Sequence, residues 1–203
     1  MYLNILSEEQ RGLLPFLDSF KKKYILVGGT AIALQIGHRK SIDFDLFTTK
    51  PIKKNEIKKA VAELKFGKQL LFEDGDGIHY LINNVKVTFF YYPFNIKAEI
   101  TVTKNVQIPS LLTLAAMKFY AMGRRAKWKD YVDIYLLLKN HFSIKEVSEK
   151  AIELFKDGYA EKLFRQQLSY FEDIDYSEIV EWISAETNNQ VIKKELTEFS
   201  LQF

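Results

Sequence analysis

The sequence predicts an α+β protein: a small, mostly antiparallel or mixed sheet flanked by helices, followed by a helical bundle. Between residues 68 and about 103 apolar residues recur at every second position, which is typical of strands. Before and after that stretch they recur every three to four positions, as on amphipathic helices. The change near Pro109 divides the 203 residues into an α/β core, 1–108, and a helical region, 109–203, expected to pack on it.

Composition excludes several classes of site and location. The chain has no cysteine, which rules out disulfides, a thiolate zinc site and a cysteine nucleophile, and is compatible with a reducing cytoplasm. The first residues lack the basic start and apolar run of a signal peptide, and no apolar stretch approaches the length of a membrane span. We therefore expect a cytoplasmic protein with no membrane partner.

The first elements follow from capping and apolar spacing. Ser7 with Gln10 forms a capping-box pattern, which predicts a helix beginning there and ending in the lysines 21–23, whose charge suits a helix C-terminus. A short buried strand is expected at 24–27 and a helix at 31–36. After Pro51, the spacing of Ile57, Val61 and Leu64 marks an apolar face.

Strands and then helices complete the chain. The period-two stretch predicts strands at 69–72, 78–82, 85–90 and 98–102, with hairpin turns at 74–77 (DGDG) and 83–84 (NN). Beyond Pro109, helices are expected from residue 110, and at 128–141, 143–155, 160–170, 177–184 and 191–199.

Two carboxylates stand at alternate positions of one further strand. Side chains two apart on a strand point the same way, so Asp43 and Asp45 share a face, and Ile42, Phe44 and Leu46 are expected on the other. Adjacent like charges are unfavourable unless a cation lies between them. Mg²⁺ binds through one or two carboxylates plus phosphate oxygens, which makes a nucleotide-bound metal the favoured ligand.

The tripeptide GGT at 28–30 joins the strand expected at 24–27 to the helix expected at 31–36. Its last residue, Thr30, precedes Asp43 by thirteen positions. By itself it fits an ordinary turn in which glycine tolerates positive φ. With the acidic pair following, a phosphate site is favoured, because free amides at a helix N-terminus attract anions and glycines allow close approach. Thr30 would add a hydroxyl donor to the same phosphate.

This arrangement resembles the nucleotidyltransferase superfamily related to DNA polymerase beta. It is more closely similar to the AbiEii/AbiGii toxin family of bacterial toxin–antitoxin, abortive-infection systems. The motifs that carry the resemblance are GGT at 28–30, GHRxSxDFDLF at 37–47, Lys118 within LAAMK at 114–118, and RRAKWKDYVD at 124–133. By motif it covers roughly residues 24–48 and 109–139.

The resemblance implies a nucleotidyltransferase fold and a Mg²⁺- or Mn²⁺-dependent enzyme. Such an enzyme transfers a nucleoside monophosphate from a nucleoside triphosphate (NTP) to an RNA hydroxyl, with the tRNA 3′ end slightly favoured, or to a protein hydroxyl, and a cognate antitoxin is a possible partner. The implied roles are triphosphate binding by Gly28, Gly29 and Thr30, metal binding by Asp43 and Asp45, phosphate charge neutralisation by Lys118, and completion of the polar site by Asp130.

Several of these residues have a structural alternative. Lys118 fits a solvated helix face, and Asp130 and Asp133 fit acids that complement a helix N-terminus. Arg39 would contact phosphate or pair with a carboxylate, and the sequence does not choose. The basic residues 124, 125, 127 and 129 around Trp128 fit either RNA binding with base stacking or a solvated interhelical loop.

One position departs from the polymerase-like pattern. Many active transferases of this type carry a third carboxylate on a neighbouring strand, and the aligned position here is Thr88. Threonine is neither an anionic ligand nor a good base, so Glu99 or Asp130 would have to substitute, or the acceptor needs no base from this strand. The alternatives are a catalytically decayed nucleotide-binding or protein-interaction module and a protein phosphotransferase. The three histidines lack ligand spacing, and no zinc site is expected.

Overall fold

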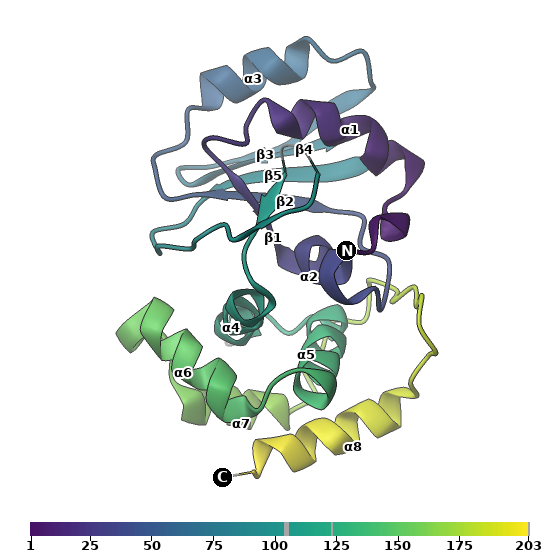
Figure 1. Cartoon of the computed structure of the whole chain (residues 1–203), viewed down its shortest axis with the longest axis vertical. Coiled ribbons are helices and arrows are strands. Elements are labelled where there is room, and N and C mark those ends of the chain that lie inside the picture. The colour runs from purple at the N-terminus through teal and green to yellow at the C-terminus, as the bar shows by residue number, and fades with distance from the viewer. Residues whose placement is uncertain (104–105, 123, 203) are drawn as a thin grey trace. The chain divides into compact units, whose positions relative to one another are not determined.

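The computed structural model describes residues 1–103, 106–122 and 124–202. They form two compact units, Met1–Ser110 and Leu111–Phe203, whose elements are labelled in Figure 1. In the described residues, no helix has the length and apolar character needed to span a bilayer.

The first unit is built on a five-stranded mixed sheet, which confirms the predicted fold class. Its spatial order is β1-β2-β5-β4-β3, with β2 and β5 parallel and the other neighbours antiparallel. The strands are β1 (Ile25–Val27), β2 (Phe44–Thr48), β3 (Lys68–Glu73), β4 (Gly77–Ile82) and β5 (Val85–Tyr91).

One face of this sheet is the core of the first unit. Leu46, Phe89 and Ile78 lie in one register row and are almost completely buried. The rings of Phe20 and Tyr24 pack edge-on against Phe89, with centroids 4.8 and 5.2 Å away. Figure 1 shows α1 (Glu8–Asp18) and α3 (Lys54–Ala62) on one side of the sheet and α2 (Gly28–Ile36) on the other.

Helix α1 begins as predicted and ends earlier than predicted. Both hydrogen bonds of the Ser7–Gln10 capping box are present. The helix stops at Asp18, because the chain turns there to place Phe20 on the sheet. The lysines 21–23 therefore follow the helix and are not its last turn, which corrects the prediction; Lys23 pairs with Glu56.

The acidic strand is shorter than predicted. Strand β2 begins at Phe44, so the alternation of faces starts there, and Phe44 and Leu46 are buried. Ile42 precedes the strand and is 58% exposed, which contradicts its predicted place on the apolar face. Asp43 lies at the same junction, one residue before pairing begins.

Both predicted hairpins are confirmed. Asp74 Oδ1 accepts hydrogen bonds from the backbone N–H groups of Asp76 (2.9 Å) and Gly77 (2.7 Å) between β3 and β4. Asn83 and Asn84 have φ of 51° and 63°, the left-handed pair that a tight two-residue hairpin requires. The strand expected at 98–102 shrinks to β6 (Ile100–Thr101), which pairs with β7 (Gln107–Ile108) outside the main sheet.

The second unit is helical, as predicted. Its elements are α4 (Leu111–Met122), α5 (Trp128–Asn140), α6 (Ile144–Phe155), the 3₁₀ turn η2 (Lys156–Gly158), α7 (Glu161–Leu168) and α8 (Asn189–Ser200); a further 3₁₀ turn, η1 (Leu3–Ile5), belongs to the first unit. Helix α4 carries few polar residues and lies among the others, with Phe119 stacked on Phe164 of α7 at 3.7 Å and Tyr120 on Phe155 of α6 at 4.2 Å. A capping box at Ser143 starts α6.

The helix predicted at 177–184 is absent, since this described segment is irregular. Asp175 exchanges backbone hydrogen bonds with Ala126 and Trp128 and accepts one from Ser177 N–H through its side chain. These bonds hold the chain extended at the point where a helix would have to begin. Ile179 in this segment is 89% exposed.

Candidate active site

The carboxylate of Asp45 lies against the turn that opens helix α2. Asp45 on β2 pairs with Val27, the last residue of β1, and Gly28 follows Val27 directly in the chain. Gly28 has φ +74°, and a β-carbon there would collide with Asp45 Oδ2 and lie 3.3 Å from its Cγ. Only glycine therefore fits, because both the backbone conformation and the space exclude a side chain.

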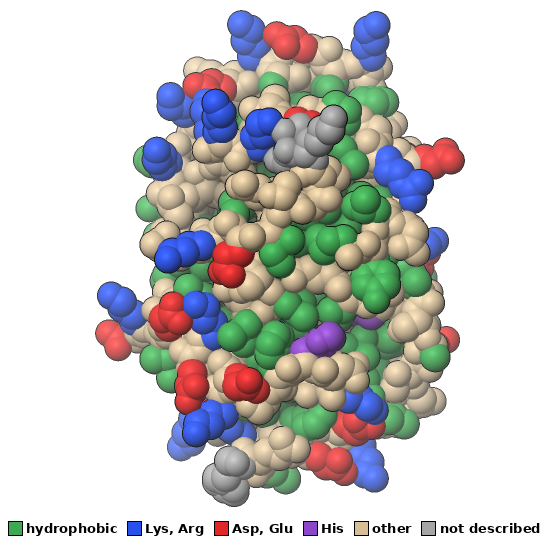
Figure 2. All heavy atoms as spheres, viewed as in Figure 1, with side chains coloured by type: hydrophobic (Ala, Val, Ile, Leu, Met, Phe, Trp, Pro, Cys, Tyr) green, Lys and Arg blue, Asp and Glu red, His purple; other side chains and the backbone are tan. Residues whose placement is uncertain are grey.

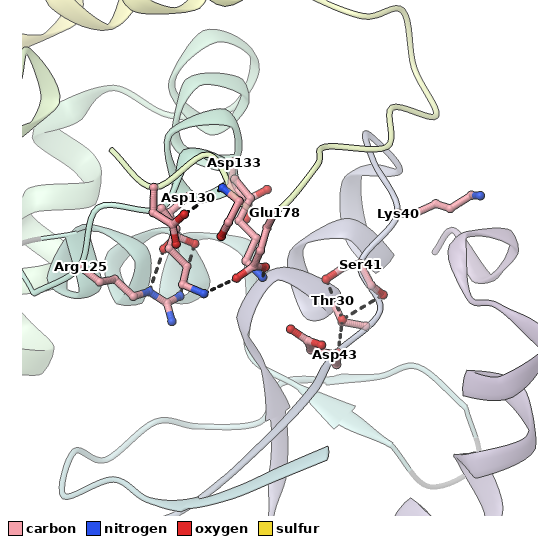
Figure 3. Close-up of polar contacts among 12 residues, drawn as sticks. Thr30, Lys40, Ser41, Asp43, Arg125, Asp130, Asp133 and Glu178 are labelled. Carbon is pink, nitrogen blue, oxygen red and sulfur yellow. Dashed lines mark hydrogen bonds and ion pairs between the residues drawn. The ribbon is translucent and has the colours of Figure 1, made fainter. Parts of the chain in front are cut away.

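Asp43 is held in place by the side chain of Thr30. Thr30 Oγ1 donates toward the main-chain carbonyl of Asp43 and lies 2.9 Å from Ser41 Oγ (Figure 3). Thr30 is 1% exposed. Its hydroxyl is thus used inside the protein to fix the start of β2, in contrast to the predicted contact with phosphate.

Arg39 is buried beneath the same turn. A β-carbon on Gly29 would lie 2.6 Å from Arg39 Nη2 and 3.2 Å from Ser41 Oγ. Arg39 Nη1 donates a 2.9 Å hydrogen bond to the carbonyl of Lys40, and the residue is 3% exposed. The guanidinium therefore adds a fixed positive charge beside the first residues of α2, where the helix dipole is also positive.

Thr88 is the direct neighbour of Asp45 on the parallel strand β5. On its other side Thr88 pairs with His79 of β4, and His79 Nδ1 lies 3.2 Å from Thr88 Oγ1. Directly paired residues share a face, so Asp45, Thr88 and His79 form one polar row across three strands. Glu99, considered as a substitute carboxylate, precedes β6 and lies outside this sheet.

In the second unit, the side chains of Lys118 and Asp130 form an ion pair with each other. Lys118 of α4 forms ion pairs with Asp130 and, at 2.9 Å, with Asp133 of α5; all three are almost completely buried. Arg125 Nε donates to Asp130 Oδ2 at 2.8 Å (Figure 3). Burial alone would raise the pKa of Asp130, but the charges of Lys118 and Arg125 outweigh it and lower that pKa. Lys118 therefore does not lie on a solvated helix face, and the two acids do more than complement the N-terminus of α5.

The basic segment before α5 is largely neutralised within the second unit. Lys127 and Lys129 both pair with Glu178, and Arg124 lies over the ring of Tyr120 at 3.7 Å. On the face drawn in Figure 2, basic and acidic side chains are interspersed. Trp128 is 5% exposed and stacks on Tyr131, which argues against one of the two alternatives for this segment, the stacking of a base on Trp128.

The described residues hold no group of three or more His, Asp or Glu side chains that would bind a metal by themselves. The Asp45 carboxylate lies beside the glycine turn, and Asp43 precedes it by two residues, with its main-chain carbonyl accepting from Thr30 Oγ1. This fits a cation such as Mg²⁺, which takes its remaining ligands from phosphate and water. The arrangement fits a cation that arrives with a polyphosphate.

Residues 16–76 and 84–198 match the model of a protein family described as nucleotidyl transferase AbiEii toxin, type IV TA system. The chain belongs to this family. An uncharacterized protein of Aquifex aeolicus (strain VF5) is 30% identical over 175 residues, covering 83% of this chain and 84% of that protein. The predicted family is thereby confirmed.

Solved structures share the nucleotidyltransferase fold of this AbiEii-family chain. MenT4, a nucleotidyltransferase toxin of Mycobacterium tuberculosis H37Rv, superposes with a TM-score of 0.58 at 11% identity, covering 88% of this chain and 74% of its own. JHP933 of Helicobacter pylori gives 0.53 at 16% identity over 96% and 91%. ANT(2″)-Ia in complex with adenylyl-2″-tobramycin gives 0.52 at 18% identity over 71% and 95%. At these identities the likeness concerns the fold alone.

Motifs in the sequence did not indicate a role in the site for Ser41 or His79. Ser41 links Thr30 to the acidic strand, and His79 stands beside Thr88. The position of His79 could have been found from the hairpin register. A two-residue turn at 83–84 pairs Ile82 with Val85, and counting residue pairs away from the turn along both strands places His79 opposite Thr88. No comparable count gives the parallel pairing of Asp45 with Thr88.

Proposed function

We propose that this AbiEii-family protein transfers a nucleoside monophosphate from an NTP to an RNA hydroxyl, with the tRNA 3′ end as favoured acceptor. We further propose that it is the toxin of a bacterial toxin–antitoxin, abortive-infection system. Family membership supports the transferase class. The observation that carries the proposal is the Asp45 carboxylate lying against Gly28 at the start of α2.

The glycine turn is the proposed triphosphate site. The backbone N–H groups of Gly28 and Gly29 open a nine-residue helix, and the helix dipole adds positive potential there. The Arg39 guanidinium next to Gly29 is a further positively charged group at the start of this helix. Thr30 acts indirectly, by fixing the backbone of Asp43.

Asp43 and Asp45 are the residues that would hold Mg²⁺ or Mn²⁺, and the bound cation would neutralise charge on the phosphates. Residues of the chain hold these two carboxylate residues in place. Hydrogen bonds of Thr30 with Ser41 and with the Asp43 carbonyl fix the backbone of Asp43, and the pairing of β2 with β1 fixes that of Asp45. Lys118 and Asp130 remain predicted site residues.

The test is transfer with NTPs labelled at the α- or γ-phosphate, supplied with Mg²⁺ and total RNA. The expected result is α-label on tRNA and release of pyrophosphate. Asp45→Asn and Asp43→Ala should abolish transfer, and the melting temperature of each variant shows whether it is folded. Asp76→Asn, in the exposed β3–β4 turn, is the matched control and should transfer normally.

Other outcomes identify the alternatives. Label on protein and none on RNA would replace the acceptor with a protein hydroxyl. Transfer of the γ-label with release of diphosphate would indicate a phosphotransferase. Full transfer by Asp45→Asn would remove the metal role from this pair and end the proposal as stated.

A second candidate function is a nucleotide-binding or protein-interaction module without catalysis. Thr88 favours it, because a neutral side chain stands directly beside Asp45 where many active relatives of the superfamily carry a carboxylate. A thermal-shift titration with each NTP and Mg²⁺ separates the two. Binding without turnover on any acceptor, together with transfer gained by Thr88→Asp, would establish the decayed module.

A further inference from the structure

The polar row on the sheet places a histidine within reach of the position that lacks a carboxylate. Asp45, Thr88 and His79 are register partners on β2, β5 and β4 and share a face. His79 Nδ1 and Thr88 Oγ1 are 3.2 Å apart. The Thr88 hydroxyl thus connects the proposed metal-binding strand to an imidazole two strands away.

A hydroxyl acceptor must lose its proton as it attacks the α-phosphorus. A third carboxylate would take that proton, and Thr88 cannot hold it because a hydroxyl is a poor base. Thr88 is 6% exposed, so bulk water has little access to its Oγ1. A threonine hydroxyl can, however, accept one hydrogen bond and donate another at the same time.

We propose that Thr88 and His79 form a proton relay that replaces the third carboxylate. The acceptor hydroxyl donates to Thr88 Oγ1, and Thr88 donates to His79 Nδ1. As the acceptor oxygen bonds to the α-phosphorus, its proton moves to Thr88 and the Thr88 proton moves to Nδ1. The bond from the α-phosphorus to the bridging oxygen breaks, and pyrophosphate leaves with the electron pair. The half-buried imidazolium then releases one proton to solvent.

The surroundings of His79 suit a neutral imidazole at pH 7. Partial burial and the charge of Lys86 lower the pKa of His79, and the carboxylates of Asp74 and Asp45 oppose them in part. The ring also packs on Phe72, with centroids 5.7 Å apart. A base with a pKa somewhat below the working pH is unprotonated and ready to accept a proton.

The first measurement is the tautomer and the pKa of His79, from ¹⁵N and ¹H NMR of the full chain. The chain has three histidines, so His38→Gln and His141→Gln spectra assign the signals. The relay requires the Nε2–H tautomer, with Nδ1 accepting from Thr88, and a pKa below 6.5. A proton resting on Nδ1 would overturn the proposal, because that nitrogen would then have no capacity to accept another.

The second measurement compares the pH dependence of transfer in variants. His79→Asn keeps an acceptor for the Thr88 hydrogen bond but cannot take up a proton; Thr88→Val removes the link. Each should lower kcat about 10²-fold or more with little change in the KM for NTP. The acid limb matching the NMR pKa should be absent from both. His141→Gln, exposed after α5, is the matched control and should retain both rate and limb.

This inference rests on the proposed function, and the two can fail separately. If wild-type protein transfers nucleotide, Asp45→Asn does not, and His79→Asn keeps its rate within threefold of wild type, the relay alone is overturned. A His79→Asn variant that is slow but retains the same acid limb also overturns it, because the role is then structural. No transfer by wild type in any condition would overturn both.

Discussion

At the scale of single residues, the site depends on Gly28 more than on any charged group. Its φ of +74° belongs to the left-handed region, and the space its β-carbon would need is filled by the Asp45 carboxylate. Gly29 is similarly confined by Arg39. The turn is therefore shaped by the absence of side chains, which leaves backbone N–H groups and a carboxylate adjacent to one another.

Gly28→Ala is expected to lower the free energy of unfolding by about 1–3 kcal/mol, because it combines a strained φ with a displaced Asp45. It should also abolish the thermal shift produced by NTPs with Mg²⁺. Urea unfolding and a thermal-shift titration measure the two effects. Gly67→Ala is the matched control, since a β-carbon there meets nothing within 4 Å. Equal NTP binding by the two variants would contradict the assignment of this turn.

At the scale of elements, α4 and α5 are joined by a buried group of ions. Lys118 of α4 meets Asp130 and Asp133 of α5, and Arg125 supplies the second positive charge. The two buried carboxylates are thus balanced by two positive charges, the buried Lys118 and the half-exposed Arg125. Replacing Lys118 by an apolar residue would remove its ion pairs with two buried carboxylates, which costs far more than losing a surface pair.

Lys118→Met is expected to lower the free energy of unfolding by about 3–5 kcal/mol, because Asp133 loses its Lys118 ion pair while remaining buried. Lys194→Met on α8 serves as the control. Its side chain is 77% exposed and 3.8 Å from Glu198, and such pairs contribute less than about 1 kcal/mol. Urea unfolding of both variants gives the comparison. A Lys118→Met loss no larger than that of Lys194→Met would show that the cluster does not stabilise the second unit.

At the scale of the whole molecule, basic and acidic charges nearly balance. The chain carries 29 basic and 26 acidic side chains, a formal net charge of +3. Two carboxylates of the second unit, Asp130 and Glu178, have lowered pKa values because the lysine and arginine charges beside them outweigh the cost of burial. Attraction of a polyanion therefore depends on local fields, such as the start of α2, and not on net charge.

Stability should decrease in acid, with the sign fixed by these lowered pKa values. A carboxylate with a native pKa below its ordinary value contributes fully above that ordinary value and loses its contribution as pH falls through the native pKa. The free energy of unfolding should thus be steady near neutral pH and fall below about pH 4. Asp130, whose pKa is lowered by the charges of Lys118 and Arg125, should contribute to this fall.

Urea unfolding at successive pH values measures this dependence, and Asp130→Asn is the informative variant. It should be less stable at pH 7 and lose less stability on acidification, because its side chain no longer titrates. Identical acid dependence in wild type and variant would show that Asp130 is not the group responsible.

Local signals in the sequence were read correctly where neighbours in the chain decide the outcome. The capping box at Ser7 and the turns at 74–77 and 83–84 involve residues three positions apart or fewer, and all three are present. The predictions that the structure contradicts depended on distant partners. The helix at 177–184 gave way to backbone hydrogen bonds of Asp175 with residues 126 and 128, and Trp128 packs against the ring of Tyr176.

The sequence by itself determined the fold class, the family, and the pairing of a glycine turn with an acidic strand, because these are written in contiguous motifs and short periods. Tertiary structure alone decided that Asp45 faces Gly28 and that Thr30 donates a hydrogen bond to the Asp43 carbonyl. It also decided that Thr88 lies between Asp45 and His79 in the sheet. The physical reason is register: strand pairing and close packing choose partners across the fold, and one residue of slip would turn each of these side chains to the opposite face.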